Sequence, residues 1–212
     1  SRSLNNEQGI KNKKGVQYVA NEYASKGFRI LVLAHSNTPI VGNSFIGECE
    51  AIALIVIKDN VRADAIETFK WFKENNVQIK VISGDNALTV SEVAKEAGVE
   101  GASKYISLEN KSLEEVKLLV DEYNVFGRVT PEQKEVIIKT LKKHNKTVAM
   151  TGDGVNDILA LKRADCSIAM ASGSDAARNV SHIVLIFLCT PLKLHSSFDD
   201  LFSFSLCLVL GI

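Results

Sequence analysis

The sequence lacks paired cysteines, an excess of charge of either sign and a long apolar run. Its four cysteines form no CxxC motif and have no histidine nearby at ligand spacing, so neither a disulfide framework nor a cysteine-based metal site is expected. The 25 basic residues balance the 25 acidic residues, which excludes a broad positive field for nucleic acid or an anionic membrane. The apolar stretch at 201–212 is shorter than the roughly 20 residues of a membrane helix.

What is present is typical of a globular α/β protein. The 212 residues are 46% hydrophobic and 24% charged, enough for one large or two small domains with real cores. Scattered cysteines are typical of a reduced, cytosolic environment. The sequence starts at Ser1 without an initiating Met or a signal peptide, so we expect a piece of a longer protein.

Two parts of the sequence differ in their pattern of secondary structure. Residues 1–57 predict a helix over 15–25 packed on a small sheet with strands over 28–34 and 48–57. From residue 58 strands alternate with helices, which predicts a doubly wound parallel sheet of the α/β class. We expect strands at 77–82, 125–126, 146–150, 166–170 and 183–186, and helices at 63–74, 87–97, 112–123, 131–143, about 158–164 and 174–179.

Two of these helices carry clear start signals. Ser112 with Glu115 predicts a capping box, and Thr130-Pro131 with Gln133 predicts a second one with a first-turn proline. The helix that starts at Pro131 is therefore expected to run to about Lys143.

The stretch at 150–157, Met-Thr-Gly-Asp-Gly-Val-Asn-Asp, is the strongest functional signal. It follows a buried strand and precedes a helix, at the junction where ligands bind in open α/β sheets. Asp153 and Asp157 offer carboxylates beside a helix N-terminus, which suits Mg²⁺ shared with a substrate phosphate. The alternative for the short Gly-Asp-Gly segment alone is a surface turn with Asp157 as a helix cap.

Three residues from different segments are expected to meet near this stretch. In a right-handed doubly wound sheet, the turns after 77–82, 124–127 and 146–150 lie at the same carboxyl edge. Ser83, Lys134 and Asp153 would then converge there and could hold a phosphoryl group and Mg²⁺. Taken singly, Ser83-Gly84 is a turn and Lys134 a solvated helix lysine.

Five segments together resemble the P-type ATPases, ion pumps whose phosphorylation domain belongs to the haloacid dehalogenase (HAD) superfamily. They are Lys-Gly-Phe-Arg-Ile-Leu at 26–31, Asp-Asn-Val-Arg at 59–62, Val-Ile-Ser-Gly-Asp-Asn at 81–86, Arg-Val-Thr-Pro-Glu-Gln-Lys at 128–134 and the acidic stretch at 151–157. Two departures from the family pattern are Asn60, where the family has proline, and Ser83, where the family has threonine.

The resemblance implies a role for each matching residue. The phosphoryl site would contain Ser83, Gly84, Asp85 and Lys134; Asp153 would bind Mg²⁺ with Asn156 and Asp157 in support; Arg29 would approach the ATP phosphates; Asp59 and Arg62 would act near the domain hinge. Mg²⁺ and the substrate ATP are therefore the expected small partners. Residues 1–57 would be the end of the nucleotide-binding domain and 58–186 most of the phosphorylation domain.

The family features that the sequence lacks limit this expectation. The phosphorylated aspartate of the family lies in an Asp-Lys-Thr-Gly-Thr segment, and the sequence contains none. Without that nucleophile no aspartyl-phosphate can form, so the chain is expected to be inactive alone. The transported cation would bind in membrane helices that are not part of this sequence. The sequence therefore does not identify the cation. The parent protein would place the chain at the cytosolic face of a membrane, and residues 173–178 resemble bacterial pumps.

Residues 187–212 depart from the family pattern. We consider a clipped membrane segment, a displaced helix or an altered reading frame for this tail. An alternative function for the whole chain is a standalone HAD-like phosphatase or a regulatory module without catalysis. The phosphatase alternative is disfavoured because no Asp-Xaa-Asp nucleophile motif follows a first strand.

Overall fold

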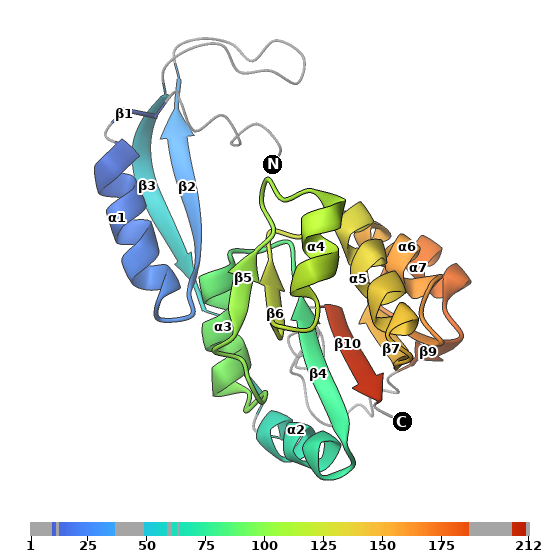
Figure 1. Cartoon of the computed structure of the whole chain (residues 1–212). Coiled ribbons are helices and arrows are strands. Elements are labelled where there is room, and N and C mark those ends of the chain that lie inside the picture. The colour runs from blue at the N-terminus through green and yellow to red at the C-terminus, as the bar shows by residue number, and fades with distance from the viewer. Residues whose placement is uncertain are drawn as a thin grey trace, which may run out of the picture. The chain divides into compact units, whose positions relative to one another are not determined.

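The computed structural model describes residues 10–11, 13–36, 49–58, 61–62, 64–186 and 205–210. Asp59, one of the expected hinge residues, lies outside these ranges. Contacts between residues divide the chain into two units, Ser1–Asp59 and Asn60–Ile212, and each is described by itself (Figure 1). The expected domain boundary at 57/58 stays a prediction.

The first unit is a small sheet that carries one helix. Strand β2 (Arg29–His35) pairs antiparallel with β3 (Cys49–Ile57), and β1 (Ile10–Lys11) pairs parallel with the other edge of β3. Helix α1 (Lys13–Ala24) lies along β2 (Figure 1). The helix and both long strands were expected from the sequence, whereas the two-residue β1 was not.

The second unit alternates strands and helices as the sequence predicts. The segment Val77–Ile82 is rich in β-branched residues, which favour an extended strand. Gly98 follows the helix that begins at Ala87 and stops it. Its elements are α2 (Ala65–Glu74), β4 (Val77–Ile82), α3 (Ala87–Glu96), β5 (Tyr105–Ser107), α4 (Leu113–Leu119), β6 (Val125–Gly127), α5 (Pro131–Lys143), β7 (Thr147–Gly152), the 3-10 helix η3 (Val155–Asp157), α6 (Ile158–Leu161), β8 (Cys166–Met170), α7 (Asp175–Val180), β9 (Ile183–Leu185) and β10 (Ser205–Leu210).

The seven strands of this unit form one sheet in the order β5-β6-β4-β10-β7-β8-β9. The pairs β5–β6, β6–β4, β7–β8 and β8–β9 are parallel, which confirms the doubly wound parallel sheet for six strands. The exception is β10, which is antiparallel to both of its neighbours. The helix considered for the tail is therefore wrong for Ser205–Leu210, which forms a central strand.

Helices cover both faces of the sheet, and each face has its own core. One core contains Ile82, Phe126 and Met150 under α4, α5, α6 and α7, and the other contains Ile79, Val81 and Val125 under α2 and α3. Because successive strand residues point to opposite faces, a strand buried on both sides is apolar at nearly every position. Full burial of a Val, Ile, Phe or Met side chain stabilises the folded state by about 1.5–3 kcal/mol relative to an exposed side chain.

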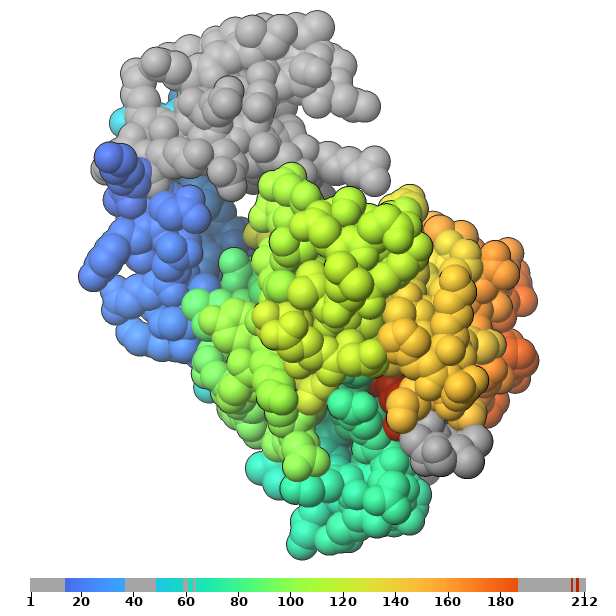
Figure 2. Space-filling view, in the orientation of Figure 1, coloured from blue at the N-terminus to red at the C-terminus, as the bar shows by residue number. Residues whose placement is uncertain are grey.

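Strand β10 completes the first of these cores. Cys207 and Val209 are 0% and 1% exposed and belong to the same cluster as Met150 and Val148. In the space-filling view a small red area, which is part of β10, lies between the segments around β4 and α5 (Figure 2). Because β10 pairs with both β4 and β7, the sheet is continuous between these two strands.

Candidate active site

The acidic stretch follows the strand β7 at the carboxyl edge of the sheet. Gly152 ends the strand, and a Cβ atom added there would lie 2.6 Å from the Cβ atom of Asp157, closer than real Cβ contacts. Only glycine therefore lets the turn of η3 fold back against the strand end. As a result Asp157, although four residues from the exposed Asp153, is 3% exposed.

A buried ion pair joins this turn to α5. Lys134 Nζ donates to Asp157 Oδ1 at 2.7 Å, and the two side chains are 8% and 4% exposed. The second carboxylate oxygen accepts the backbone N–H of Gly154 at 3.2 Å. Burial of both charges is tolerable because each is paired and hydrogen-bonded. The alternative of a solvated Lys134 is wrong, and Asp157 does more than cap a helix.

The position of Lys134 follows from the start of α5. Thr130 caps the helix, accepting the N–H of Gln133 at 3.3 Å, and the Gln133 side chain accepts the N–H of Thr130 at 3.0 Å. The predicted capping box is thus confirmed, as is the box at Ser112 and Glu115. With its first turn fixed, α5 presents Lys134 one turn further on, toward the end of β7.

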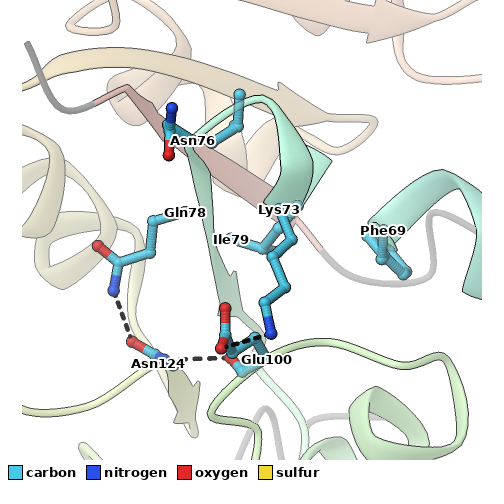
Figure 3. Close-up of a pocket in the computed structure, with 8 residues that line it drawn as sticks. Phe69, Lys73, Asn76, Gln78, Ile79, Glu100 and Asn124 are labelled. Carbon is cyan, nitrogen blue, oxygen red and sulfur yellow. Dashed lines mark hydrogen bonds and ion pairs between the residues drawn. The ribbon is translucent and has the colours of Figure 1, made fainter. Parts of the chain in front are cut away.

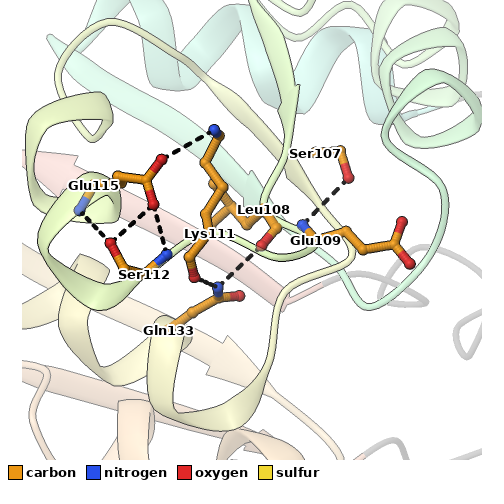
Figure 4. A network of polar contacts seen from close by, with 7 residues as sticks. All are labelled: Ser107, Leu108, Glu109, Lys111, Ser112, Glu115 and Gln133. Atoms are coloured by element: carbon orange, nitrogen blue, oxygen red, sulfur yellow. Dashed lines mark hydrogen bonds and ion pairs between the residues drawn. The ribbon is translucent and has the colours of Figure 1, made fainter.

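The Gln133 side chain also connects α5 to the loop before α4 by hydrogen bonds. Its Nε2 atom donates to the carbonyls of Leu108 at 3.0 Å and Lys111 at 2.9 Å (Figure 4). The side chain is 4% exposed, so these bonds satisfy an amide that would otherwise be costly to bury. The beginning of α5 is therefore fixed on two sides.

The segment after β4 is tied to the same place. Arg128 donates its backbone N–H to the carbonyl of Asp85 at 2.7 Å, and Val129 donates to the carbonyl of Ser83 at 3.0 Å. Arg128 has φ +54°, an uncommon conformation outside glycine that marks a tightly constrained turn. These bonds hold the residues after β4 against those that lead into α5.

Ser83, Gly84 and Asp85 form a bend at the end of β4. Ser83 is 4% exposed, and its Oγ atom accepts the N–H of Asp85 at 3.1 Å. Gly84 is exposed and has no atom within 4 Å of an added Cβ. The segment forms a turn, as expected for Ser83-Gly84 taken singly. It also lies at the carboxyl edge, where a hydroxyl and backbone N–H groups can bind an anion.

Asp153 and Asn156 are exposed at the end of β7. Mg²⁺ prefers oxygen ligands and is often held by only one or two carboxylates together with waters and phosphate oxygens. An exposed carboxylate beside a buried lysine fits this chemistry. Among the described residues no group of three or more His, Cys, Asp and Glu side chains is placed to hold a metal ion.

The remaining expected residues lie elsewhere in the chain. Arg29 opens strand β2 in the first unit, opposite Ile57. Arg62 pairs with Asp64, its Nε donating to Oδ1 at 2.8 Å, and the hydrogen bond from Arg62 lowers the pKa of the Asp64 carboxyl. The structure therefore gives Arg62 a local partner that the sequence analysis did not foresee.

Two further residues position Asp153 without having been predicted to do so. Ser174 donates its backbone N–H to the carbonyl of Asp153 at 2.7 Å. Arg178 holds this loop, donating from Nη1 to the carbonyls of Ala171 at 2.7 Å and Gly173 at 2.5 Å. The only sequence signal was the resemblance of 173–178 to bacterial pumps, which gave no structural role.

A pocket of about 450 Å³ lies at the opposite end of β4 (Figure 3). Lys73 of α2 pairs with Glu100 across it at 2.9 Å, and Gln78 donates to Asn124 at 3.1 Å. Val77 and Asn76 also line it, which places it at the amino edge of the sheet. The pocket is thus separate from the residues around Asp153.

This arrangement defines the class of protein. Residues 26–165, more than half of the chain, match the haloacid dehalogenase-like hydrolase family, and the chain belongs to that family. Within it, the curated relatives named below are cation-transporting ATPases, so the chain is homologous to a part of the P-type ATPases.

Two relatives illustrate this homology. A probable cation-transporting ATPase of Streptococcus pneumoniae is 43% identical over 183 residues, which are 85% of this chain and 22% of the relative. A calcium-transporting ATPase of Mycobacterium bovis is 44% identical over 167 residues, 79% of this chain and 21% of the relative. The chain thus spans about a fifth of the length of these proteins.

Among solved structures, a zinc-transporting PIB-type ATPase in its E2.Pi state is similar with a TM-score of 0.49. The sequences are 25% identical, and the match covers 79% of this chain and 22% of that protein. Within the part of the chain that the structure describes, no helix is long and apolar enough to cross a bilayer.

Proposed function

We propose that the chain is the phosphorylation-domain part of an ATP-driven cation pump and that its carboxyl edge binds Mg²⁺ together with a phosphoryl group. The observation that carries the proposal is the buried pair of Lys134 and Asp157 beside the exposed Asp153. Asp153 would hold Mg²⁺, which supplies positive charge for phosphate oxygens. Ser83 and Gly84 would donate to those oxygens, and Lys134 would neutralise their charge.

Asp157 has a positioning role in this proposal. Its carboxylate binds Lys134 at 2.7 Å and the N–H of Gly154 at 3.2 Å, so it fixes the lysine relative to the loop that carries Asp153. Phosphoryl transfer depends chiefly on such positioning and on electrostatic stabilisation. Asp85 and Asn156 would orient the loops on either side.

In the whole protein the domain would act on ATP at the cytosolic face of a membrane. Arg29 in the first unit would approach the nucleotide, and Asp59 and Arg62 would lie at the hinge. The phosphorylated aspartate would come from a segment that this sequence does not contain, so the chain alone should not hydrolyse ATP. The transported cation stays unassigned.

Thermal unfolding with Mg²⁺ and inorganic phosphate tests the proposal. A ligand that binds only the folded state at 100 times its Kd stabilises by about 2.7 kcal/mol, a rise of about 5–10 °C for this size. The rise should vanish in Asp153→Asn and persist in Asp121→Asn, which changes an exposed carboxylate paired with His144 at 2.8 Å. Equal shifts in both variants would refute Asp153 as the Mg²⁺ ligand.

A further inference from the structure

A cluster of basic residues lies at the amino edge of the sheet, opposite the candidate active site. This cluster, the basic patch, consists of Lys139, Lys142, Lys143, Lys146, Lys162 and Arg163. Its members occupy the last part of α5, the turn before β7 and the segment directly after α6, and no acidic residue lies between positions 139 and 146. Because a helix between parallel strands returns the chain to the amino ends of the strands, the patch lies at that edge.

Hydrogen bonds and ion pairs join the two segments that carry the patch. Lys142 Nζ donates to the carbonyl of Arg163 at 2.9 Å and pairs with Asp165 at 2.7 Å. Arg163 Nε in turn pairs with Glu135 of α5 at 2.7 Å. The helices α5 and α6 lie side by side (Figure 1), so the basic residues at their ends form one surface.

Part of the positive charge of the patch is not neutralised within the protein. Lys139, Lys142 and Arg163 pair with the carboxylates of Glu135 and Asp165. Among the described residues, no partner contacts the other three side chains, which are those of Lys143, Lys146 and Lys162. Six basic side chains therefore face two carboxylates, an excess of four positive charges.

The charges of the second unit are divided between the two edges of its sheet. The carboxyl edge carries Asp85, Asp153 and Asp157, whereas the amino edge carries the patch. Lysines in the last turn of α5 stabilise that helix through its dipole, but Lys146 lies beyond the helix. Although the whole chain has no net charge, this unit has a positive and a negative end, and it should turn the positive end toward an anionic surface.

The composition of the patch favours a membrane surface over a nucleic acid. All but one of its members are lysines, whose ammonium groups act as hydrated point charges, whereas arginine is preferred for bidentate contacts with phosphate. Residues 139–146 and 158–163 contain no aromatic side chain on which a base could stack. A diffuse positive surface without stacking groups suits anionic lipid headgroups, to which each lysine strengthens binding by about fivefold.

We propose that the basic patch binds the headgroups of anionic phospholipids. In the proposed function the chain is tied to a membrane, and such a tether raises the effective concentration of lipid, so a weak affinity is sufficient. The bound domain directs its carboxyl edge, with Asp153, away from the lipid surface. This orientation of the site rests on the proposed function, whereas the binding of lipid does not.

Co-sedimentation with lipid vesicles tests the proposal. The full 212-residue chain is mixed in EDTA with vesicles of phosphatidylcholine alone or of equal parts phosphatidylcholine and phosphatidylglycerol. It should bind only the anionic vesicles, and salt should weaken this binding because it screens the charges. EDTA removes the Mg²⁺ that the candidate active site would use, so failure of the proposed function would not affect the result. Absence of binding at low salt, or equal binding to both vesicles, would overturn the proposal.

Inorganic phosphate distinguishes a lipid surface from a site for the free anion. Sodium phosphate should reduce vesicle binding no more than sodium chloride of the same ionic strength, because exposed lysines respond to ionic strength. A clearly stronger effect of phosphate would assign the patch to the free anion. Binding of polyuridylate RNA without binding of vesicles would assign it to nucleic acid. Either result would overturn the proposal.

Two triple variants with the same change in net charge locate the binding. One replaces by glutamine the three lysines without partners, Lys143, Lys146 and Lys162. It should bind anionic vesicles about 100-fold more weakly, at about fivefold for each lysine. The control replaces three lysines outside the patch, Lys14, Lys26 and Lys111. It should lose less than about fivefold, the effect of one lysine in the patch. Equal losses in the two variants would overturn the proposal.

Acetylation of lysines in the unmodified protein gives a second readout. When about nine-tenths of the protein is bound to vesicles, Lys143, Lys146 and Lys162 should react up to about tenfold more slowly, by mass action. Lys111, which precedes α4 at the carboxyl edge, should react at an unchanged rate. Mass spectrometry of the peptides measures both rates. Protection of Lys111 and not of the patch lysines would mean that the opposite edge faces the lipid, and it would overturn the proposal.

Discussion

At the scale of single residues, the buried pair of Lys134 and Asp157 sets the largest expected effect. Lys134→Met leaves the Asp157 carboxylate buried without its cation, which should lower the free energy of unfolding by about 3–5 kcal/mol. Lys139→Met, which removes a half-exposed lysine paired with Glu135 at 2.8 Å, should cost less than about 1 kcal/mol. Urea unfolding measures both.

A double variant separates the ion pair from the rest of the site. Lys134→Met combined with Asp157→Leu removes both charges, so it should be more stable than Lys134→Met alone. If the double variant were the less stable of the two, the loss would come from packing and not from an unpaired carboxylate.

Lys80 and Cys207 make the free energy of unfolding depend on pH, in a direction that their pKa shifts define. Burial lowers the pKa of Lys80 from its ordinary 10.5 to about 8, so between these values the unfolded chain binds more protons and the free energy of unfolding rises with pH. Burial also raises the pKa of Cys207 from 9.0 to about 12. The folded chain then keeps a proton that the unfolded chain loses, and stability falls above pH 9. The net rise is therefore expected between about pH 8 and 9.

Chemical unfolding at several pH values checks this prediction. Lys80→Met should abolish the rise of at most about 1.4 kcal/mol per pH unit, whereas Lys143→Met, at an exposed position, should retain it. Cys207→Ala should extend the rise above pH 9. A rise that survived Lys80→Met would assign the effect to another group.

The residues of the site were predictable only to the extent that they lie in short motifs. The sequence analysis predicted site roles for Asp153, Ser83 and Lys134 because each lies beside a strand end or a helix start that the local sequence pattern predicts. The partner of Lys134 was not foreseen, because Asp157 lies 23 residues away and the contact depends on how α5 packs on η3. The same holds for Ser174, whose backbone N–H carries no signal in the sequence.

At the scale of elements, close packing of α3 on β6 depends on one glycine. A Cβ atom at Gly127 would lie 2.3 Å from Cα and 2.4 Å from N of Ala87, which are backbone atoms that cannot move aside cheaply. Gly127→Ala should therefore destabilise the protein by about 1–3 kcal/mol. Gly84→Ala, where no atom lies within 4 Å, should change stability by less than about 0.5 kcal/mol.

Thermal or urea unfolding of these two variants decides the matter. Similar midpoints would mean that α3 can shift away from β6 at little cost. Because Gly84 belongs to the candidate phosphoryl site, only stability and not ligand binding is compared.

The elements that the sequence announced are those with local signals. The strand at 77–82 has the expected bounds, and α5 ends at Lys143 as its caps and charges predicted. Three strands were missed. The two residues of β1 and the three residues of β5 are too few for a pattern, and β10 is an almost entirely apolar run whose pattern fits a strand or a helix. Only the open place between β4 and β7 selects the extended form.

At the scale of the whole molecule, the two units differ in how much they bury. Among the described residues of 1–59, Ala24 is the only buried hydrophobic side chain, and Leu31, Leu33, Ile52 and Ile55 are about half exposed or more. The second unit contains both core clusters. Local opening should therefore require less free energy in the first unit.

Hydrogen exchange measures this difference. Amides of β2 and β3 should exchange at least about 100-fold faster than those of β7, which corresponds to about 2.7 kcal/mol, after correction for intrinsic rates. Equal protection would mean that the first unit is stabilised by contacts beyond those described.

The class of fold followed from the sequence because alternating strands and helices leave few arrangements. The order of strands did not follow completely, since nothing local states that a segment more than 50 residues after β7 inserts beside it. Placement of that strand depends on complementarity within the finished sheet.

The central position of β10 also bears on how the protein is made. The strands β5, β6 and β4 form one half of the sheet and β7, β8 and β9 the other, and β10 joins them. During synthesis both halves leave the ribosome before β10 does, each with an unpaired apolar strand edge. Such edges invite wrong pairing and aggregation, so the nascent chain should depend on chaperones that shield them until β10 arrives.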